Sequence, residues 1–347
     1  MDSDRDSGKP GLVARADEAR RLARSEPEAA ERQARAVLAE AREAGDSAAL
    51  LRAHYTLGAI AVMDARYEEA VGRVAEGSAE LAALGVGASP ELLNVQGTAY
   101  RYLGMYGLAT ERLLQAERLV RESDKPELVH PVLNNFALAL SEIGEKEKAY
   151  GLFVEAEAAA RAAGNDYVVL LTRSNIGSAL TNLGRLDEAL ALLEATVESS
   201  RAAGLDSVLA DALDNLGQAR TASGSLREAE TDFRSALAIE RRLGQAAVAS
   251  LTREHLAENL LLQGRFAEAE AEARCAYEAA CRADHASLRS SSVLARAKAL
   301  EALGRFREAA EAYRERVELD AADARAEGRA AYRELSARLA REAEARA

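Results

Sequence analysis

The chain of 347 residues contains no tryptophan, five prolines and two cysteines. Strong helix formers, chiefly Ala, Leu, Arg and Glu, take their place, and this composition indicates an all-α protein. Cys275 and Cys281 lie six residues apart in one expected helix, where a rise of about 9 Å keeps their Cα atoms too far apart for a disulfide. We therefore interpret both cysteines as small, half-buried side chains in a reducing compartment.

Basic residues are outnumbered, and lysine in particular is scarce. There are 45 Lys and Arg against 57 Asp and Glu, which gives a formal net charge of −12. Sequence-independent binding to nucleic acid requires a basic stripe that displaces counterions, and anionic membrane surfaces also attract basic segments. We therefore expect no direct nucleic-acid partner and no membrane partner.

Long apolar runs are also absent. No stretch approaches the roughly 20 apolar residues that span a bilayer. The first residues, Met1–Asp6, are acidic and lack the apolar core of a secretory signal. These two absences lead us to expect a cytoplasmic protein.

A short stretch, Asn182–Ala189 (NLGRLDEA), recurs along the chain at a fixed spacing. Its glycine returns every forty residues without slippage, at Gly104, Gly144, Gly184, Gly224, Gly264 and Gly304. A repeat of this length is typical of a solenoid, in which each unit packs only on its neighbours. One elongated array is therefore expected in place of the two or three domains that the length alone suggests.

Small residues recur with the same spacing on both sides of this glycine. Five residues after it, or after the equivalent position, alanine is invariant: Ala30, Ala70, Ala109, Ala149, Ala189, Ala229, Ala269 and Ala309. Seven residues before it stand Gly58, Gly97, Ala137, Gly177, Gly217, Ala257 and Ala297. Small side chains at matching positions allow two antiparallel helices to approach closely, so each unit is predicted to be a helix hairpin. In the second unit Ala65 occupies the position of the glycine.

Two further series mark the ends of the predicted helices. Polar residues that suit a helix N-cap precede each first helix: Asp46, Ser89, Asp124, Asn165, Asp206 and Asp284. Larger side chains follow the glycine and are expected to close the open end of the hairpin: Tyr67, Tyr106, Leu186, Leu226, Phe266 and Phe306. Lys146 interrupts this second series, so the fourth unit is expected to be looser.

These patterns divide the chain into a tail, a solenoid and a terminal helix. Residues 1–11 are expected to be disordered, and 12–321 to form hairpins at about 12–45, 46–85, 86–124, 125–164, 165–204, 205–244, 245–284 and 285–321. Residues 322–347 are expected to form a charged helix that either caps the last hairpin or connects to another protein. A coiled coil through this helix, which would give a homodimer, remains an alternative.

The small residue, the seven-residue gap, the glycine, the aromatic or leucine and the Glu-Ala pair together resemble the tetratricopeptide repeat. The resemblance covers about residues 12–320 and implies a right-handed superhelical solenoid of seven to eight repeats. The forty-residue length departs from the usual 34 and falls in the range of HEAT repeats, which do not explain the small-residue pattern. The longer form is similar to the repeats of kinesin light chain and of bacterial peptide receptors, which bind peptides in an inner groove.

The resemblance implies that the first helix of each hairpin lines a concave surface. Three consecutive asparagines and a histidine, spaced forty apart, then form a polar ladder whose amides can pair with a peptide backbone. The residues predicted to line this groove are Asn94, Asn134, Asn135, Arg173, Ser174, Asn175, Ser178, Asn182, Asp214, Asn215, Gln218 and His255. The structural alternative is that the ladder bonds to the neighbouring first helix and sets the twist of the solenoid.

Several arginines replace apolar residues of the repeat. Arg173 and Arg253 either reach an acidic ligand or pair with a nearby Glu while their stems lie along apolar surface. Arg220 and Arg296 are further exceptions, and Arg296 is expected to meet Glu334 or another carboxylate of the terminal helix. The Lys/Asn/Lys/Arg set of carboxylate-clamp tetratricopeptide domains is not found, so recognition of a chaperone C-terminus is not expected.

No enzyme motif is found. The sequence contains no phosphate loop, nucleophile elbow or histidine pair at metal-ligand spacing, so no catalytic residue, metal or cofactor is expected. The leading hypothesis is a non-catalytic scaffold that binds a peptide or protein segment in its groove. The alternatives are a regulatory input module that acts on a separate output protein in bacterial signalling or transcription, and a self-assembling structural protein.

Overall fold

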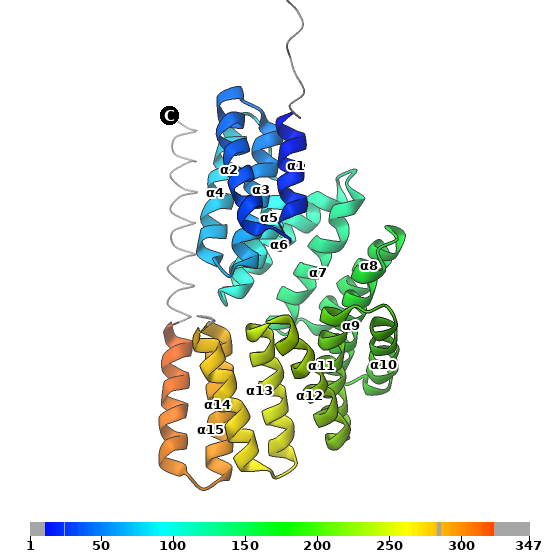
Figure 1. Cartoon of the computed structure of the whole chain (residues 1–347), viewed down its shortest axis with the longest axis vertical. Coiled ribbons are helices and arrows are strands. Elements are labelled where there is room, and N and C mark those ends of the chain that lie inside the picture. Colours follow the sequence, from blue (N-terminus) through cyan, green and yellow to red (C-terminus); the bar gives the residue numbers. More distant parts are fainter. Residues whose placement is uncertain (1–10, 24, 283–285, 323–347) are drawn as a thin grey trace, which may run out of the picture. The chain divides into compact units, whose positions relative to one another are not determined.

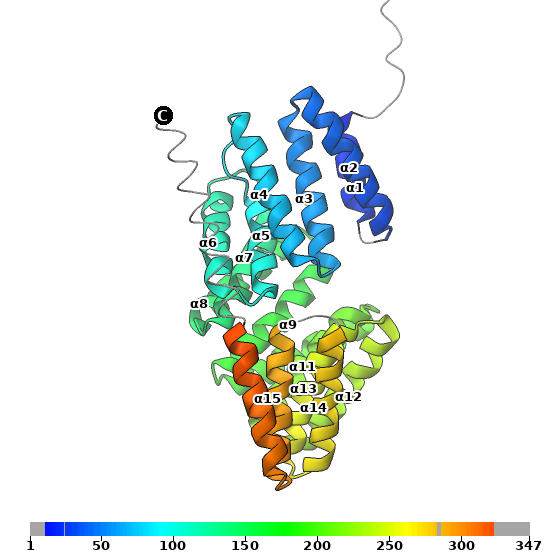
Figure 2. The same cartoon turned by 90° about the vertical axis from the view of Figure 1, so that its left-hand side faces the viewer.

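The computed structural model describes residues 11–23, 25–282 and 286–322, and its ordered elements there are all helices. The chain divides into two compact units, residues 1–101 with 107–135 and residues 102–106 with 136–347. We describe each unit by itself. Figures 1 and 2 show that each unit is built from helices lying side by side.

The first unit contains three hairpins and the start of the next helix. Its helices are α1 (Leu12–Leu22), α2 (Pro27–Ala44), α3 (Ser47–Met63), α4 (Tyr67–Ala83), α5 (Pro90–Tyr102) and α6 (Tyr106–Arg121). Helix α7 (Pro126–Glu142) begins in the first unit and ends in the second. Helix α3 packs on α2, on α4 and on α1, so the first helices of successive hairpins contact one another.

The second unit continues the same arrangement. Its helices are α8 (Lys146–Ala162), α9 (Asp166–Asn182), α10 (Leu186–Ala202), α11 (Asp206–Ser223), α12 (Leu226–Leu243), α13 (Ala246–Leu262), α14 (Phe266–Arg282) and α15 (Ala286–Ala302). A further helical segment, 306–322, ends the described part of the chain. First helices again contact one another, α9 with α11, α11 with α13 and α13 with α15, which confirms the predicted all-α solenoid of helix hairpins.

The recurring glycine closes each hairpin in a left-handed conformation. Gly184 has φ of 75° and Gly224 has φ of 86°, values that L-residues rarely adopt. After Gly184 the chain turns back so that Arg185 N donates to Leu180 O at 2.9 Å, which satisfies a carbonyl at the end of α9. Ala65, the one exception in the series, is also the one described residue other than glycine with positive φ, at 57°.

Replacing Ala65 with glycine is expected to stabilise the protein by about 1 kcal/mol, because it removes the cost of a left-handed alanine. The side chain of Ala65 is exposed, so no packing is lost. Ala203, also exposed and at a helix C-cap but with φ of −83°, provides the control. There the same substitution should destabilise by about 0.5–1 kcal/mol. Chemical denaturation of both variants checks this, and two changes of the same sign would contradict it.

The glycines of this series on α5, α9 and α11 each face a large residue of the second helix, sixteen positions later. A Cβ added to Gly177 would lie 2.4 Å from Leu193, and one added to Gly217 would lie 2.6 Å from Phe233. At Ala257 the facing residue is Ala273, and the two pack in one buried cluster. Glycine faces a large residue in the first two of these hairpins, and alanine packs with alanine in the third.

The helix ends agree with the sequence at some caps and differ at others. The carboxylate of Asp46 accepts from Ala48 N and Ala49 N, and the side chain of Asn165 accepts from Val168 N. The prediction for Asp206 was wrong: Leu205 precedes α11, and Asp206 begins the helix and pairs with Arg242 at 2.9 Å. Helix α7 begins two residues after Asp124, and Asp284 lies outside the described residues.

The residues after the glycine are partly buried in most units, as predicted for side chains that close the hairpin. Phe306 is different, because 69% of its surface is exposed. Each earlier hairpin has a following hairpin beside it, whereas 306–322 is the last segment that the structure describes. Lys146, which interrupts the series, is exposed and donates from Nζ to Asn182 O at 3.0 Å.

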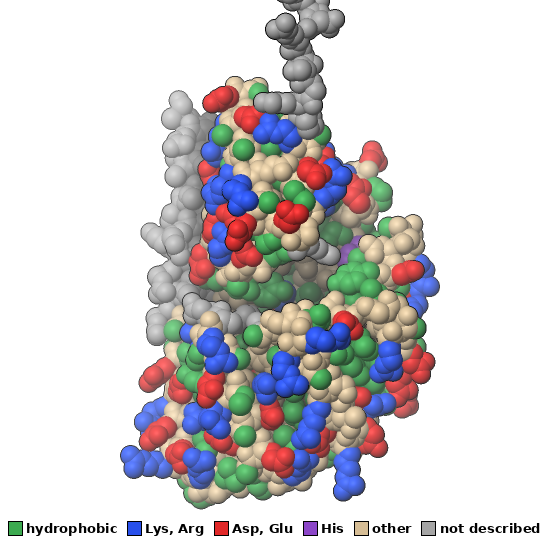
Figure 3. Space-filling view, viewed as in Figure 1, with side chains coloured by type: hydrophobic (Ala, Val, Ile, Leu, Met, Phe, Trp, Pro, Cys, Tyr) green, Lys and Arg blue, Asp and Glu red, His purple; other side chains and the backbone are tan. Residues whose placement is uncertain are grey.

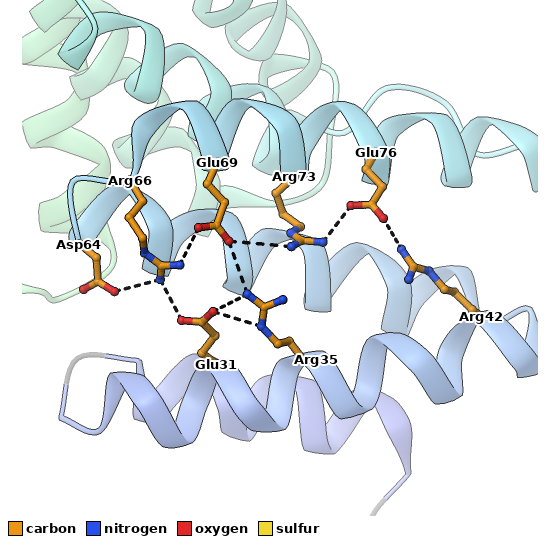
Figure 4. A network of polar contacts seen from close by, with 8 residues as sticks. All are labelled: Glu31, Arg35, Arg42, Asp64, Arg66, Glu69, Arg73 and Glu76. Atoms are coloured by element: carbon orange, nitrogen blue, oxygen red, sulfur yellow. Dashed lines mark hydrogen bonds and ion pairs between the residues drawn. The ribbon is translucent and has the colours of Figure 1, made fainter.

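Ion pairs join second helices of neighbouring hairpins in the first unit. Arg42 on α2 reaches Glu76 at 2.6 Å on α4, and Arg66, just before α4, reaches Glu31 on α2 at 2.8 Å. Figure 4 shows the resulting network of Glu31, Arg35, Arg42, Asp64, Arg66, Glu69, Arg73 and Glu76. Because most of these side chains are partly exposed, each ion pair alone contributes little to stability. A larger contribution requires that several pairs act together as a network.

Candidate functional site

The twelve residues predicted from the sequence all lie on first helices. Asn94 is on α5, Asn134 and Asn135 are on α7, and His255 is on α13. The other eight are on α9 and α11, namely Arg173, Ser174, Asn175, Ser178, Asn182, Asp214, Asn215 and Gln218. Because α9 packs on α11 and α11 on α13, the second unit brings nine of the twelve onto three consecutive helices.

The ladder is linked from one first helix to the next by a recurring hydrogen bond. In the first unit, Asn135 Nδ2 donates to Asn94 Oδ1 at 3.0 Å. In the second unit, Asn215 Nδ2 donates to Ser174 Oγ at 2.9 Å. Each pair is separated by 41 residues in the chain.

His255 and Asp214 continue the series one repeat later, again 41 residues apart. Nδ1 of His255 donates to the Asp214 carboxylate at 2.9 Å from Oδ1 and 3.0 Å from Oδ2. These inter-helix bonds are the ones that the structural alternative expects.

Gln218 connects two of these rungs. Its Nε2 donates to Asp214 Oδ2 at 3.0 Å and to Asn215 Oδ1 at 3.3 Å. Both amide hydrogens of Gln218 are thereby used within the protein, while its Oε1 keeps its capacity to accept. Asn135 likewise donates to a neighbouring first helix, so both of these side chains use amide donors within the protein.

Exposure separates the ladder residues into two groups. Asn94, Asn135, Asn175, Ser178, Gln218 and His255 are half-buried, and Asn182 is exposed. Ser174 is fully buried, and Asn134, Asp214 and Asn215 are buried beneath their neighbours. The first group has surface with which to touch a ligand directly, whereas the second group holds the first in position.

The arginines that interrupt the apolar pattern pair with carboxylates of this chain. Arg173 Nε donates to Glu157 Oε1 at 2.8 Å, and Arg253 Nη1 donates to Glu272 Oε2 at 2.8 Å. Arg296 lies 3.5 Å from Glu270. The expected partner of Arg296, Glu334, falls outside the described residues.

Arg220 forms the most buried of these pairs. Its Nη1 lies 2.7 Å from Asp232 Oδ2, and its Nη2 lies 2.9 Å from Glu194 Oε1. Asp232 is buried, and burial raises its pKa even though the Arg220 charge acts in the opposite direction. The pair therefore places an ionised contact at a position where the repeat usually has apolar residues.

An acidic cluster that was not predicted from the sequence lies beside the ladder. Glu240 of α12 is fully buried, and burial raises its pKa to about 7. Burial also raises the pKa of Asp211 to about 6 and that of Glu254 above its usual range. For His255 burial alone would lower the pKa, but the Asp214 carboxylate and its hydrogen bond raise it to about 9.

A sequence signal for this cluster was present. The position of Glu240 is taken by Ser200 one repeat earlier, by Ala160 two repeats earlier and by Ala280 one repeat later. A glutamate in a series of small, buried residues is an exception of the same kind as Arg220. Charged residues at positions that are small or apolar in neighbouring repeats are the sequence signal for such a cluster.

No group of three or more His, Cys, Asp and Glu side chains within the described ranges is placed to hold a metal ion. Over the same ranges, no helix combines the length and the apolar character needed to cross a bilayer. On the face shown in Figure 3, acidic and basic side chains are interspersed over the surface of each unit.

The hairpins, their left-handed glycine turns and the linked first helices define a helix-hairpin solenoid. The family model of the tetratricopeptide repeat matches residues 168–242, and a second model with the same description matches residues 291–323. The chain therefore contains tetratricopeptide repeats, as the sequence resemblance predicted. No curated protein matches its sequence.

Solved structures with the same fold share little sequence with this chain. A Rap protein complexed with Competence and Sporulation Factor is 16% identical, with a TM-score of 0.66 over 90% of this chain and 99% of that one. NprR in complex with its cognate peptide NprX is 15% identical, with a TM-score of 0.63 over 82% and 83%. A signal transduction ATPase with a tetratricopeptide repeat sensor from Pyrococcus horikoshii is 13% identical, with a TM-score of 0.58 over 88% and 46%. At these identities the likeness shows the fold alone.

Proposed function

We propose that this protein is a non-catalytic scaffold that binds an extended peptide or partner segment along its first helices. The polar ladder of α9, α11 and α13 is the surface we assign to this role. The observation that carries the proposal is the partial exposure of Asn175, Ser178 and Gln218 on neighbouring helices. A segment of another protein crossing these helices would meet one polar side chain after another.

The hydrogen bonds within the ladder suggest what kind of group it recognises. Gln218 donates to Asp214 and Asn215 through its Nε2, so its Oε1 is the atom that can accept a hydrogen bond from a ligand. An extended peptide offers a backbone N–H at regular intervals, and such donors match carbonyl acceptors on the ladder. The ladder amides are also held in place before binding, which lowers the entropy lost when a ligand binds.

One of the similar structures supports a peptide as the ligand. NprR, which shares the fold, was solved with its cognate peptide. At 15% identity this likeness does not carry the peptide sequence over to our chain. It supports the class of ligand and leaves the identity to experiment. We place the protein in the cytoplasm, where such a partner would be met.

A second candidate function is a regulatory input module that acts on a separate output protein. The observation that favours it is the ATPase of similar fold, whose tetratricopeptide repeats are described as a sensor. This candidate uses the same ladder and adds a consequence of binding. A homodimer through residues 322–347 would also fit such a role, but these residues lie almost wholly beyond the described part of the chain.

Selection from a displayed library of random ten-residue peptides tests the proposal. Peptides enriched on the wild-type protein should lose about thirtyfold in affinity when Asn175→Ala and Gln218→Ala are combined, because two hydrogen bonds of about 1 kcal/mol each are lost. Fluorescence anisotropy of a labelled selected peptide measures the change. Circular dichroism checks that the variant remains folded.

The matched control combines Ser199→Ala and Ser235→Ala, two exposed polar residues on the second helices α10 and α12. It should bind the selected peptides as the wild type does. Equal affinity for both double variants, or enrichment of no peptide at all, would contradict the proposed binding surface.

A further inference from the structure

Glu240 is a carboxylate in the interior of the second unit. It lies near the end of α12 and has no exposed surface. Its Oε1 accepts from Thr252 Oγ1 of α13 at 2.8 Å. Its Oε2 is buried and has no hydrogen-bond partner among the described residues. An ionised carboxylate in such a place would leave one charged oxygen unsatisfied, which is costly.

The groups around Glu240 make ionisation harder. From α11, the carboxylates of Asp214 and Asp211 act on it, and Asp211 Oδ2 is also buried without a partner in the described part of the chain. From α13, His255 is the cationic group that acts on Glu240. The charge of His255 is already shared with Asp214, which receives its hydrogen bond at 2.9 Å.

Four other charged residues of α11 and α13 have partners of their own. Glu254 of α13 accepts from Ser291 Oγ of α15 at 2.6 Å, and Glu258 of α13 lies 3.6 Å from Lys298 of α15. Arg220 of α11 is held by Asp232 and Glu194. Arg253 of α13 is held by Glu272. None of these pairs uses its cation to neutralise Glu240.

The geometry points to a proton-dependent lock, in which α11, α12 and α13 pack tightly while Glu240 carries a proton and loosen when it loses that proton. A protonated Glu240 is neutral and can donate, so it removes both the repulsion from Asp211 and Asp214 and the unsatisfied charge. This inference does not depend on the proposed ligand. It nevertheless concerns the helices that carry Asn215, Gln218 and His255.

The direction of the pH dependence follows from the burial of Glu240. Because the pKa of Glu240 is raised from 4.5 to about 7 in the folded protein, its stabilising effect is complete below pH 4.5 and is lost as the pH rises to 7. His255 adds a second loss of the same sign at higher pH, since its stabilising effect is complete below pH 6.5 and lost as the pH rises to about 9.

Melting curves of the full chain at pH 5.0 and pH 7.5 test the lock. Glu240→Gln keeps the shape of the side chain and is always neutral. The melting temperature of this variant minus that of the wild type should rise by about 5 °C between the two pH values. Glu228→Gln, an exposed change of the same charge on the same helix, should give a difference that does not depend on pH.

Two further measurements keep the inference testable if Glu240→Gln folds poorly. Glu240→Ala installs the residue that Ala160 and Ala280 show to be compatible with this position. Its melting temperature should also lack the pH dependence that Glu240 gives the wild type. In the wild type, amide hydrogen exchange corrected for intrinsic rates should accelerate in α11–α13 between pH 5.0 and 7.5, with no matching change in α2–α4. Uniform protection at both pH values, or a pH-independent difference for both Glu240 variants, would overturn the lock.

Discussion

Replacing Arg220 with methionine is expected to cost about 3–5 kcal/mol of unfolding free energy, one of the largest effects of any single substitution in this chain. Arg220 supplies the charge that lies 2.7 Å from the buried Asp232 carboxylate. Removing one partner of a buried ion pair leaves the other charge uncompensated, which is the expensive part of such a change. The free energy lost from packing of the arginine stem is small compared with this charge effect, because the methionine side chain has a similar length.

Replacing both partners should have a different result. The equivalent of Arg220 is leucine in the neighbouring repeats, at Leu180 and Leu260, and the equivalent of Asp232 is Leu192 one repeat earlier. Combining Arg220→Leu with Asp232→Leu therefore restores residues that the repeat already accommodates. We expect this double variant to be as stable as the wild type or more stable by about 1–4 kcal/mol.

Urea denaturation of Arg220→Met and of the double variant measures these effects. If Arg220→Met costs less than 1 kcal/mol, the pair is effectively solvated and the assignment of a buried charge is wrong. If the double variant is as unstable as the single one, the ion pair contributes stability in its own right and the comparison with neighbouring repeats fails.

Replacing Gly177 with alanine should destabilise the protein by about 1–3 kcal/mol, although alanine is the better helix former by about 1 kcal/mol. The added Cβ would lie 2.4 Å from Leu193 Cγ, a distance at which the leucine must move. Gly151 provides the control, because it lies on α8 with nothing within 4 Å of the added Cβ. The same substitution there should stabilise by about 1 kcal/mol.

A second change should rescue the first. Gly177→Ala combined with Leu193→Ala reproduces the Ala257 and Ala273 pair, which the chain already uses two repeats later. Leu193→Ala alone should cost about 2–5 kcal/mol by leaving a cavity. The double variant should cost less than the sum of the two single variants, with a coupling of at least about 1 kcal/mol in the double-mutant cycle. Strict additivity would mean that the two residues do not face each other.

The helical solenoid could be predicted from the sequence because its determinants repeat. Each hairpin needs a small residue at the crossing and a left-handed residue at the turn, so the same few side chains return every forty positions. Even the exception at Ala65 was visible, and it proved to have positive φ. The start of α11 was less predictable: Asp206 suits the N-cap by residue type, but it is the first residue of the helix, and Leu205 stands at the N-cap without a side-chain hydrogen bond.

Less of the candidate site could be predicted from the sequence. The spacing predicts that Asn175, Asn215 and His255 occupy equivalent positions, but it does not say which atoms are already bonded. The hydrogen bond from Asn215 to Ser174 depends on the offset between two neighbouring helices, which a single repeat does not encode. Glu240 was missed for a related reason: its neighbours Asp211 and Asp214 come from another helix.

Photocrosslinking tests most directly the central claim that a peptide lies along the first helices. A photoreactive phenylalanine analogue would replace half-buried Ser178 on the first helix α9 or exposed Asp187 on the second helix α10. With a selected peptide bound, mass spectrometry should find the crosslink from position 178 and little or none from position 187. Crosslinking from position 187 alone would place the ligand on the second helices and contradict the account.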